Sequence, residues 1–326
     1  MESFSGKKAL VTGINGFVGT HLARTLMEKG MEVHGLVRDA KNIPYLDGAN
    51  LPEKPHLHVG DIRDADAVRK AVSAHEYSHV FHLASQSNTW KSAENPRETF
   101  EINTLGTLNL LEAIRQTNHT PSFIMGGSVR VFHYTAKPGQ IGKEEGMHAY
   151  DASKAMAEMM VSSYLQTYGM NGAIARNTNL YGGNDLNFFR LIPTIMKGVL
   201  VDHAIKLWGK GQVKRDFLYV RDAVDGMVLL GEKAENKSIR GNAFTFASGE
   251  TSSVNDICSM VKDISPVPFS IEWSEKNNVS DRDQEALDVS HTQEVLGWAP
   301  HTSMKDGLQK TMQWYHDYFS KKEEAK

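Results

Sequence analysis

Three glycines near the beginning of the chain constrain its fold more than any other feature. Gly13, Gly16 and Gly19 follow a short apolar segment over residues 8–12 and precede a segment with helical periodicity over residues 18–29. Glycine lets a backbone turn sharply and approach a bound group, and a helix that begins at such a turn directs its N–H groups toward an anion. The spacing therefore predicts a strand–turn–helix unit that opens a βαβ fold and binds the pyrophosphate of a dinucleotide.

Strand and helix patterns alternate through the rest of the first half. The predicted strands span residues 8–12, 31–37, 56–59, 79–83 and 122–125, and the predicted helices span residues 18–29, 64–74 and 97–116. Such alternation is typical of parallel strands joined by right-handed helical crossovers. It predicts an α/β fold with a Rossmann-type, doubly wound parallel sheet covered by helices on both faces.

The second half is less regular. Residues 177–214 are rich in loop-forming residues, and later segments predict helices over residues 220–231, 253–264 and 303–319 and a strand over residues 243–247. We expect a dinucleotide-binding domain over residues 1–178 and a smaller C-terminal substrate-binding region over residues 179–326, with residues 217–247 returning to the first domain. Open α/β sheets bind ligands at the carboxyl ends of their strands, so the second region is expected to cap that edge.

Composition favours a soluble enzyme. Of 326 residues, 40% are hydrophobic and 23% are charged, and the net charge of -3 offers no basic surface for nucleic acid or for an anionic membrane. No apolar stretch approaches the ~20 residues that span a bilayer, and the first residues lack an apolar run typical of a secretion signal, so we expect a cytoplasmic protein. Cys258 is the only cysteine and no Cys/His cluster with zinc-ligand spacing occurs, so the sequence predicts no metal site.

The end of the second predicted strand bears on the choice of dinucleotide. Enzymes that use NAD place a carboxylate there for the ribose 2′-hydroxyl, whereas an arginine suits the 2′-phosphate of NADP. Val37 occupies the expected acid position and Arg38 follows it, which favours NADP. Asp39 is near enough to leave NAD open, and a solvated surface charge is the alternative interpretation of Arg38.

Tyr150 and Lys154 precede a helical segment over residues 155–168. Residues four apart share one face of a helix, so both side chains can enter one site. A phenol has an ordinary pKa of about 10, and a nearby ammonium and a cationic nicotinamide would lower the pKa of Tyr150 by favouring the phenolate. Tyr150 is therefore a candidate acid/base, with Lys154 also orienting the ribose, and Ser128 follows a predicted strand where its hydroxyl could bond the substrate. The Tyr–Lys spacing carries little information alone but more downstream of a dinucleotide loop.

Further motifs occur in order along nearly the whole chain. They are Gly60-Asp61, His82-Leu83-Ala84-Ser85-Gln86, Asn103, Arg176-x-x-Asn179-x-Tyr181-Gly182, Arg215-Asp216-Phe217 and Leu296-Gly297-Trp298-x-Pro300. With the glycine loop and the Tyr–Lys pair, they resemble the extended short-chain dehydrogenase/reductase family, which contains the NAD-dependent nucleotide-sugar epimerases and dehydratases. Residues 179–193 are similar to the CDP-glucose 4,6-dehydratase branch. The opening segment, through residues 33–38, is similar to GDP-mannose dehydratases and their partner reductases, so the branch stays open.

The resemblance implies roles for individual residues. The implied cofactor-binding residues are Gly13, Asn15, Gly16, Phe17, Val18, Gly19, Arg38, Asp61, Ile62, Leu83, Ala84, Ser85, Asn103, Tyr150 and Lys154, with Asp61 and Ile62 at the adenine. The implied catalytic residues are Ser128, Tyr150 and Lys154, and those implied for the nucleotide diphosphate of the substrate are Asn179, Arg190, Arg215 and Arg282. Arginine suits phosphate because its planar fork binds two oxygens, although a surface salt bridge is the alternative for each. The family also implies a homodimer formed through residues 97–116 and 153–168.

The residues after Ser128 bear on the reaction. The resemblance implies that a 4,6-dehydratase needs acidic or lysine side chains there to move the C5 proton and the C6 hydroxyl. Val129 cannot transfer a proton and Arg130 stays protonated, so only His133 remains as a nearby substitute. We therefore predict hydride transfer at sugar C4 of a nucleotide-diphosphate sugar, by an epimerase or a 4-ketoreductase.

Three other functions stay open. One is a CDP-glucose or GDP-mannose type 4,6-dehydratase, which the similar branches favour. Another is a non-catalytic dinucleotide sensor, which the same fold permits but which the retained Tyr–Lys pair disfavours. The third is an enzyme of the same family that acts on a non-sugar carbonyl or alcohol, against which the phosphate-binding arginines argue.

Overall fold

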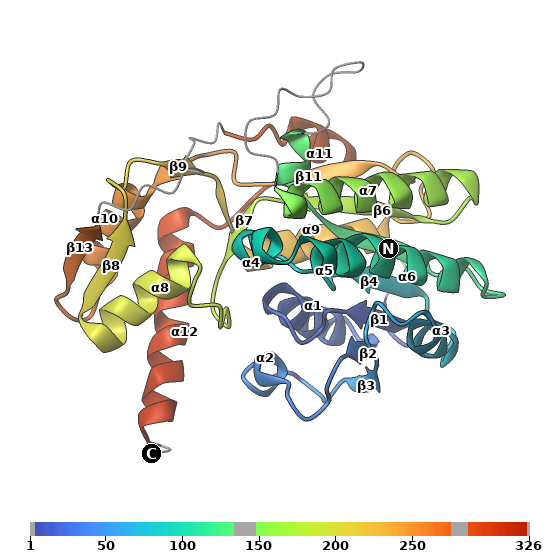
Figure 1. The fold of residues 1–326 in the computed structure, drawn as a ribbon, viewed down its shortest axis with the longest axis horizontal. Coiled ribbons are helices and arrows are strands. Elements are labelled where there is room, and N and C mark those ends of the chain that lie inside the picture. The colour runs from blue at the N-terminus through green and yellow to red at the C-terminus, as the bar shows by residue number, and fades with distance from the viewer. Residues whose placement is uncertain (1–3, 134–147, 275–285, 325–326) are drawn as a thin grey trace. The chain divides into compact units, whose positions relative to one another are not determined.

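The computed structural model describes residues 4–133, 148–274 and 286–324. Contacts within the chain divide it into two compact units (Figure 1). Unit 1 comprises Met1–Asn177 and Val224–Thr245, and unit 2 comprises Thr178–Ala223 and Phe246–Lys326. The chain therefore leaves unit 1, returns to it once and ends in unit 2.

Within the described residues, unit 1 is built around a sheet of seven strands in the order β11-β6-β5-β4-β1-β2-β3. The strands are β1 (Lys8–Thr12), β2 (Glu32–Val37), β3 (His56–Val59), β4 (His79–His82), β5 (Ser122–Ser128), β6 (Gly172–Asn177) and β11 (Ala243–Phe246). Neighbouring strands from β3 to β6 pair in parallel. The order reverses between β1 and β4, which is where such sheets bind ligands. The predicted doubly wound α/β fold is confirmed.

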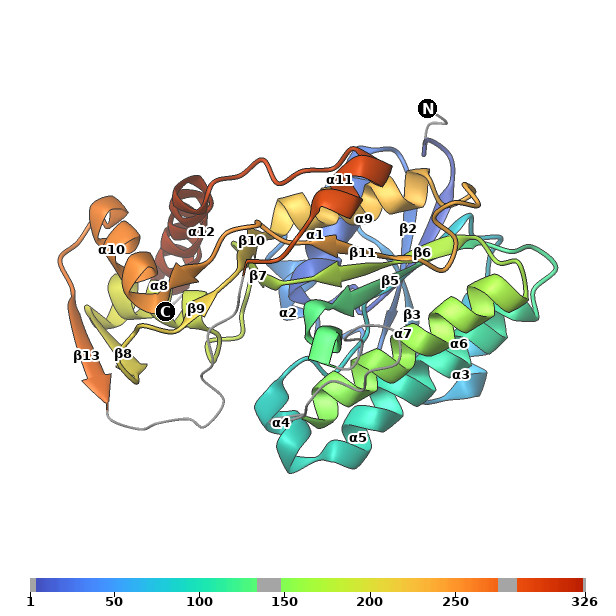
Figure 2. The same ribbon diagram turned by 90° about the horizontal axis from the view of Figure 1, so that it is seen from above.

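Helices cover both faces of this sheet, with α1 and α9 on one face and α3, α6 and α7 on the other (Figure 2). The helices that lie wholly in unit 1 are α1 (Phe17–Glu28), α2 (Pro44–Asp47), α3 (Ala65–Ser73), α4 (Thr89–Glu94), α5 (Pro96–Phe100), α6 (Gly106–Arg115) and α7 (Ala149–Thr167), and most of α9 (Val220–Glu232) also belongs to it. Because both faces are covered, a central strand is apolar on both sides, and Ala9, Leu10 and Val11 are fully buried.

A large apolar cluster packs the sheet against α3, α6 and α7. Leu10 and Phe123 from the strands meet Val68 of α3 and Leu110 of α6. Burying each of the larger side chains contributes roughly 1.5–3 kcal/mol, so this layer holds the strand ends in place. Asp64 is the N-cap residue of α3, and its carboxylate accepts two N–H groups of the first turn.

The predicted helix over residues 97–116 is interrupted in the structure. α5 ends at Phe100, the π-helical turn Glu101–Leu105 follows, and α6 begins at Gly106. Such a turn adds a residue to the helix and changes the direction of the side chains, and it occurs often at functional sites. Here the turn carries Asn103, which is 2% exposed and makes the long-range contacts described below.

Other boundaries also differ from prediction. α7 begins at Ala149, so Tyr150 and Lys154 both lie within the helix and not ahead of it. β5 continues to Ser128, and the short 3-10 helix Val129–His133 follows. β6 was not predicted, because its apolar run is short and ends in the polar pair Arg176-Asn177.

Unit 2 contains three two-stranded sheets among its described residues. β7 (Asn179–Tyr181) pairs with β10 (Phe217–Tyr219), β9 (Lys214–Arg215) with β12 (Ser252–Ser253), and β8 (Ala204–Trp208) with β13 (Ser270–Ser274). Its helices are α8 (Leu191–Lys197) with the π-helical turn Gly198–Asp202, α10 (Val254–Ile264), α11 (Ser290–Leu296) and α12 (Met304–Glu324). The segment 177–214, predicted as loop-rich, thus contains β7, α8 and β8.

A separate apolar core holds unit 2 together. Tyr181, Ile195, Ile257, Leu308 and Tyr315 are all nearly or fully buried in it. None of the helices in the described part of the chain is long and apolar enough to cross a bilayer.

Candidate active site

The three glycines after β1 differ in what an added side chain would contact. Gly13 has a φ of +72°, and an added Cβ there would lie 2.7 Å from the backbone of Leu83 and Ala84. An added Cβ at Gly19 would lie 2.1 Å from the carbonyl oxygen of Gly13. At Gly16 the only described atom within 4 Å of an added Cβ is that same oxygen, at 3.2 Å. Packing therefore requires Gly13 and Gly19, whereas Gly16 leaves room for the close approach of a ligand.

The N-terminus of α1 has the features of an anion site. Gly16 is its N-cap residue, no side chain caps the helix, and its first turn holds no acidic residue. By contrast, the side chain of Asp64 caps α3. Backbone N–H groups and the helix dipole at α1 can thus receive a negatively charged group, and the residues present fit a dinucleotide pyrophosphate. Phe17 is buried in the first turn of α1 and Val18 is half-buried.

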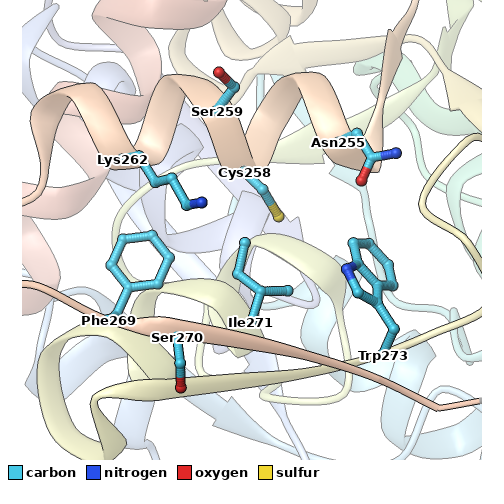
Figure 3. A pocket seen from close by; sticks show the side chains of 8 residues that line it. All are labelled: Asn255, Cys258, Ser259, Lys262, Phe269, Ser270, Ile271 and Trp273. Carbon is cyan, nitrogen blue, oxygen red and sulfur yellow. The ribbon is translucent and has the colours of Figure 1, made fainter.

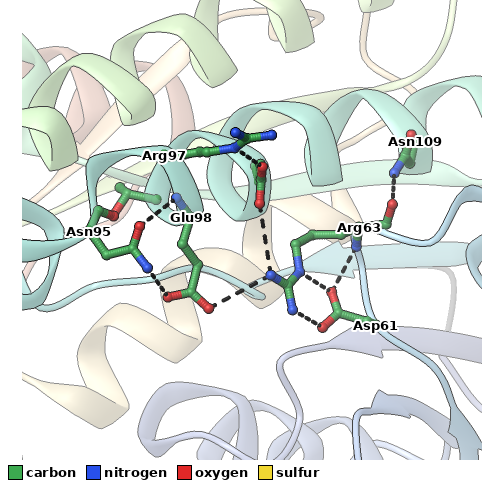
Figure 4. Close-up of polar contacts among 8 residues, drawn as sticks. Asp61, Arg63, Asn95, Arg97, Glu98 and Asn109 are labelled. Atoms are coloured by element: carbon green, nitrogen blue, oxygen red, sulfur yellow. Dashed lines mark hydrogen bonds and ion pairs between the residues drawn. The ribbon is translucent and has the colours of Figure 1, made fainter.

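Arg38 and Asp61 lie where an adenosine would be expected, beyond β2 and β3. Val37 is buried, whereas Arg38 is exposed. The carboxylate of Asp39 accepts the N–H of Lys41 at 2.8 Å, so it serves a local turn. Two hydrogen bonds from Arg63, 3.0 Å and 2.8 Å long, hold Asp61 (Figure 4). These bonds are the main cause that lowers the pKa of Asp61, and the charge of Arg38 also lowers it.

The same arginine ties the end of β3 to α5. Arg63 Nη1 lies 3.7 Å from Glu98 and 3.9 Å from Glu101, and the Asn95 side chain caps the N–H of Glu98 (Figure 4). Ile62 is buried, and Asn109 donates to its carbonyl oxygen at 3.1 Å. The contacts of Arg63 and Asn109 therefore hold the predicted adenine-binding residues Asp61 and Ile62 in place.

The side chain of Asn15 is directed to α2. Its Oδ1 accepts the N–H groups of Tyr45 and Leu46 at 3.2 Å and 3.4 Å, and its Nδ2 donates to the carbonyl oxygen of Asn42. What Asn15 can offer a dinucleotide is therefore its backbone. Sequence reasoning assigned the residue but did not identify this bracing role.

A buried chain of hydrogen bonds supports the loop after β4. Ala84 N–H donates to Thr12 Oγ1 at 3.3 Å, which lies 2.7 Å from His82 Nδ1. His82 Nε2 lies 2.9 Å from Thr107 Oγ1, which donates to the carbonyl oxygen of Asn103. Burial lowers the pKa of His82 to about 3, so the ring is neutral, and its proton lies on Nε2 because Thr107 has already donated its own. His82 belongs to one of the motifs seen in the sequence, whereas no sequence signal pointed to Thr12 or Thr107.

Asn103 connects that loop to the first turns of α7. Its Oδ1 accepts the N–H of Gln86 at 2.7 Å, and its Nδ2 donates to Ser153 Oγ at 2.9 Å. Ser153 in turn donates to the carbonyl oxygen of Tyr150 at 2.8 Å. The buried Asn103 thus positions the half-buried Leu83, Ala84 and Ser85 loop relative to Tyr150.

Ser128, Tyr150 and Lys154 come from two adjacent elements of unit 1. Ser128 ends β5, and the other two lie one turn apart on α7, which packs against β5. All three are at most 9% exposed. Lys154 Nζ donates to the carbonyl oxygen of Gly126 at 2.7 Å. Burial lowers the pKa of Lys154 to about 8, against the opposing effect of Glu158, so it is a cation at neutral pH with its proton readily released.

Arg130 forms an ion pair with Asp151, directly after Tyr150. Its Nη2 lies 3.1 Å from Oδ2, and its Nε contacts Oδ1. Asp151 is fully buried, whereas the Arg130 side chain is 39% exposed. Val129 is apolar and 8% exposed. The two side chains after Ser128 therefore offer no acid/base group, and the side chain of His133 lies outside the described residues.

The candidate substrate residues lie in unit 2. Asn179 Nδ2 donates to the carbonyl oxygen of Asp216, the residue that follows Arg215 in the sequence, at 2.9 Å. Arg215 Nη1 donates to the carbonyl oxygen of Lys214 at 2.8 Å. Arg190 Nη1 lies 3.0 Å from the buried carboxylate of Asp185. Burial raises the pKa of Asp185, and the charge of Arg190 partly offsets this rise. Arg282 lies outside the described residues.

Unit 2 also has a hollow that these candidate substrate residues do not line. It has a volume of about 410 Å³, lies between α10 and β13 (Figure 3), and is lined by Asn255, Cys258, Ser259, Lys262, Phe269, Ser270, Ile271 and Trp273. Burial raises the pKa of the Cys258 thiol to about 11, so the thiol is unreactive at neutral pH. None of the predicted site residues lines this hollow, so the chemistry argued above does not involve it.

Comparison with known proteins identifies the family. The family model described as GDP-mannose 4,6 dehydratase matches residues 10–311. The chain belongs to this family. The predicted membership of the extended short-chain dehydrogenase/reductase family is thereby confirmed.

Relatives in this family are named for more than one reaction. A trifunctional UDP-glucose 4,6-dehydratase/UDP-4-keto-6-deoxy-D-glucose 3,5-epimerase/UDP-4-keto-L-rhamnose-reductase from Arabidopsis thaliana is 26% identical over 97% of this chain, which spans 48%, about half, of that protein's length. UDP-glucuronate 4-epimerase 4 from the same plant is 29% identical over 97% of this chain and 77% of its own. The structure of Thermus thermophilus UDP-glucose 4-epimerase in complex with NAD superposes with a TM-score of 0.80, 25% identity and coverage of 94% of this chain and 98% of the other. Family membership alone thus leaves the reaction to be argued from the site.

Proposed function

We propose that this chain transfers hydride at C4 of a nucleotide-diphosphate sugar without removing water, as a 4-epimerase. The observation that carries the proposal is the state of the two residues after Ser128. Val129 is an apolar, buried side chain, and the guanidinium of Arg130 is committed to Asp151. Dehydration across C5 and C6 requires a group that removes one proton and another that protonates the departing hydroxyl, and neither side chain does this. Hydride transfer at C4 needs only Ser128, Tyr150 and Lys154.

The dinucleotide is held by the carboxyl edge of the sheet. The α1 N-terminus and Gly16 accommodate the pyrophosphate, and Arg38 and Asp61 flank the adenosine. When bound, the dinucleotide supplies the nicotinamide that accepts and returns a hydride. Tyr150 Oη removes the proton from sugar O4 on oxidation and returns it on reduction, while the Ser128 hydroxyl donates a hydrogen bond to the same oxygen. The Lys154 ammonium favours the phenolate of Tyr150.

A 4-ketoreductase that uses NADPH is the second candidate. The specific observation in its favour is the end of β2, where buried Val37 replaces the expected carboxylate and Arg38 is exposed. The nearby Asp39 carboxylate already accepts the N–H of Lys41. We infer a preference for NADP over NAD on this basis, although the Thermus relative was solved with NAD. A reductase consumes its cofactor, whereas an epimerase regenerates it in each turnover.

Unit 2 is proposed as the substrate-binding region. Asn179, which bonds to the backbone of Asp216, and the preceding Arg215 would offer an amide and a guanidinium to a nucleotide diphosphate. Arg190 is also proposed to bind the nucleotide diphosphate, because it occupies the matching position of the family motif. The ion pair with Asp185 partly offsets its charge. The plant relatives are named for reactions of UDP-sugars, which makes a UDP-sugar the first substrate to test.

A homodimer is proposed from exposed apolar side chains on the predicted interface helices. Leu105 is 51% exposed, Met156 47% and Met159 70%. Apolar side chains grouped on helix surfaces in this way are typical of interfaces between copies. Light scattering on the purified protein is expected to give the mass of two chains, and Met159→Glu is expected to lower it. A monomer for the unchanged protein would rule the dimer out.

The decisive experiment supplies a panel of nucleotide sugars with NAD or NADP and follows the products by mass spectrometry and NMR. A product of unchanged mass with inverted C4 supports the proposed epimerase. Reduction of an added 4-ketosugar with consumption of NADPH supports the second candidate. A product lighter by one water would overturn the argument from Val129 and Arg130. If a dinucleotide binds but every sugar returns unchanged, even with NADPH and ketosugars supplied, a non-catalytic sensor becomes the leading interpretation.

A further inference from the structure

Four histidines gather toward the amino ends of β2, β3 and β4 in unit 1. His34 of β2 lies opposite His56 of β3 in the parallel register, and His58 lies two residues further along on the same face. His75, from the connection between α3 and β4, brings its ring centroid to 4.4 Å from that of His34. β2 and β3 therefore present several imidazoles on one face of the sheet, beside the connection that leads into β4.

Three of these rings have the spacing of metal ligands. One nitrogen from each of His34, His58 and His75 lies within 4.8 Å of the other two. His34 Nδ1 and His58 Nε2 are 3.2 Å apart. In a tetrahedral zinc site with Zn–N bonds of about 2.0–2.1 Å, two ligand nitrogens lie about 3.3 Å apart. His34 and His58 thus already have the required separation, and a side-chain rotation of His75 would complete the set.

Glu32 supports this arrangement from the other side of the His34 ring. Its Oε1 lies 2.8 Å from His34 Nε2, and its Oε2 lies 2.6 Å from Lys8 Nζ. One carboxylate oxygen of Glu32 is thus engaged by the Lys8 ammonium and the other by the His34 ring. Metal-bound histidines usually donate their second ring N–H to a carboxylate, which leaves the first nitrogen's lone pair for the ion. Glu32 therefore selects the tautomer in which His34 Nδ1 is the ligand.

His58 has a second polar contact besides the one with His34. His58 Nε2 also lies 3.1 Å from the hydroxyl of the buried Tyr77. An ion would replace the His34–His58 and Tyr77–His58 hydrogen bonds, and it can enter from solvent because His58 is only half-buried.

A second set of ligand atoms is less suitable. Glu32, His34 and His56 also approach one another within 4.8 Å. That set would use His34 Nε2, which faces Glu32, and a carboxylate that already pairs with Lys8. His56 is 65% exposed and lies 4.0 Å from Glu32. The all-histidine set keeps the Glu32 contacts intact and is therefore preferred.

We propose that His34, His58 and His75 form a binding site for one divalent transition-metal ion of the zinc type, with Glu32 orienting His34. Imidazole nitrogens favour Zn²⁺, Cu²⁺ and Ni²⁺ over Mg²⁺ and Ca²⁺, and a fourth position stays open for water. The ion would fasten the edge strand β3 and the α3–β4 connection to β2. None of Ser128, Tyr150, Lys154 and the three loop glycines belongs to this ligand set, so the ion is assigned a structural role and no part in hydride transfer.

The test uses full-length protein from which any polyhistidine tag has been removed and any bound metal exchanged out with chelator. Titration with ZnCl₂ by calorimetry is expected to show about one ion per chain, and Cu²⁺ is expected to give an electron paramagnetic resonance spectrum with imidazole nitrogen couplings. His58→Gln and His75→Ala are each expected to weaken zinc binding at least about tenfold, and Glu32→Gln about tenfold. His316→Gln, which changes an exposed histidine of α12, is the matched control and should bind as the unchanged protein does.

Either of two results would overturn the proposal. One is zinc binding that is no tighter in the unchanged protein than in His58→Gln and His75→Ala, and the other is binding that only His316→Gln weakens. If the cluster variants fail to fold, the unchanged protein still decides the question. Zinc should then protect the peptides that carry His58 and His75 from modification by diethylpyrocarbonate, and equal modification with and without zinc would show a hydrogen-bonded histidine stack only.

Discussion

At the carboxyl ends of the strands, α1 begins at Gly16 with no side-chain cap, and the buried Lys154 has a pKa lowered to about 8. At the amino ends, polar side chains are paired with one another, as in the Lys8–Glu32 ion pair and the contact between His34 and His58. In a doubly wound sheet, helix N-termini and their positive dipole ends follow the carboxyl ends of the strands. The fold itself therefore prepares one edge for an anionic, reactive ligand, whereas the other edge must satisfy its polar groups with its own side chains.

The largest expected effect tests the chemistry of the carboxyl edge. Tyr150→Phe removes the group proposed to move the proton at sugar O4, so kcat is expected to fall about 10³-fold. Steady-state kinetics on the substrate found in the panel measures this fall. Zinc affinity at the amino edge should not change, because the two sites share no residue.

Tyr168→Phe is the matched control for this variant. Tyr168 follows the end of α7 and is 52% exposed, so its substitution should leave kcat within about twofold. If Tyr150→Phe retained activity within tenfold of the unchanged protein, Tyr150 would not be the proton-transfer group.

The carboxyl edge also contains one pair of charges that neutralise each other, as at the amino edge. This pair is Arg130 and Asp151. Arg130→Gln leaves the fully buried Asp151 carboxylate without its counter-charge, so the free energy of unfolding is expected to fall by about 3 kcal/mol, or roughly 100-fold in the folding equilibrium. Urea denaturation measures the change. Asp66→Asn breaks an exposed pair with Arg69 and should cost less than about 1 kcal/mol. Equal, small losses in both variants would mean that Arg130 is not committed to Asp151.

The two edges of the sheet also differ in how much of their structure could be predicted from the sequence. The glycine loop, β1 and β3 were predictable because each lies within one short run of residues with its own turn or strand signal. The placement of Tyr150 and Lys154 one turn apart on a helix was predictable because four-residue spacing needs no long-range contact, whereas their catalytic role stays a prediction. Features of the carboxyl edge that depend on local spacing are thus readable from the chain.

Features that depend on contacts distant in sequence were not predictable. The π-helical turn at Asn103 exists alongside hydrogen bonds to Gln86 and Ser153, which lie 17 and 50 residues away. The Arg130–Asp151 pair joins residues 21 apart. The histidines at positions 34, 58 and 75 come from three separate parts of the chain, so their spacing in the sequence does not match a metal-binding motif. The sequence-based expectation of no metal site therefore could not take their geometry into account.

Gly16→Ala separates ligand binding from packing within the glycine loop. An added Cβ at this position has only the Gly13 carbonyl oxygen nearby, at 3.2 Å, so the ligand-free protein should fold with a stability change below about 1 kcal/mol. Dinucleotide affinity should fall at least about tenfold, because the methyl group occupies the space for the pyrophosphate. Calorimetric titration with NADP and NAD measures it. Gly19→Ala, whose Cβ would lie 2.1 Å from the same oxygen, should instead destabilise the ligand-free protein strongly, and the reverse pattern would contradict this division.

The smallest expected effect is a pH dependence that assigns a titration to one edge. Burial lowers the pKa of Lys154 from 10.5 to about 8, so above pH 8 the ammonium that supports Tyr150 is lost and kcat/KM should fall, about tenfold by pH 9. Between pH 8 and 10.5 the unfolded chain binds this proton while the folded protein does not, so Lys154 makes stability rise with pH over the window in which activity falls. Opposite slopes of activity and stability would therefore identify this lysine.

Lys154→Arg sharpens the assignment, because a guanidinium stays protonated over the whole range. Its residual activity should lack the decline above pH 8. The amino edge cannot produce this decline, since the lowered pKa values of His34 and His58 leave both rings neutral from pH 7 upward. If the decline persisted unchanged in Lys154→Arg, the titrating group would lie outside the proposed site, and the distinction between a reactive carboxyl edge and a self-satisfied amino edge would lose its kinetic support.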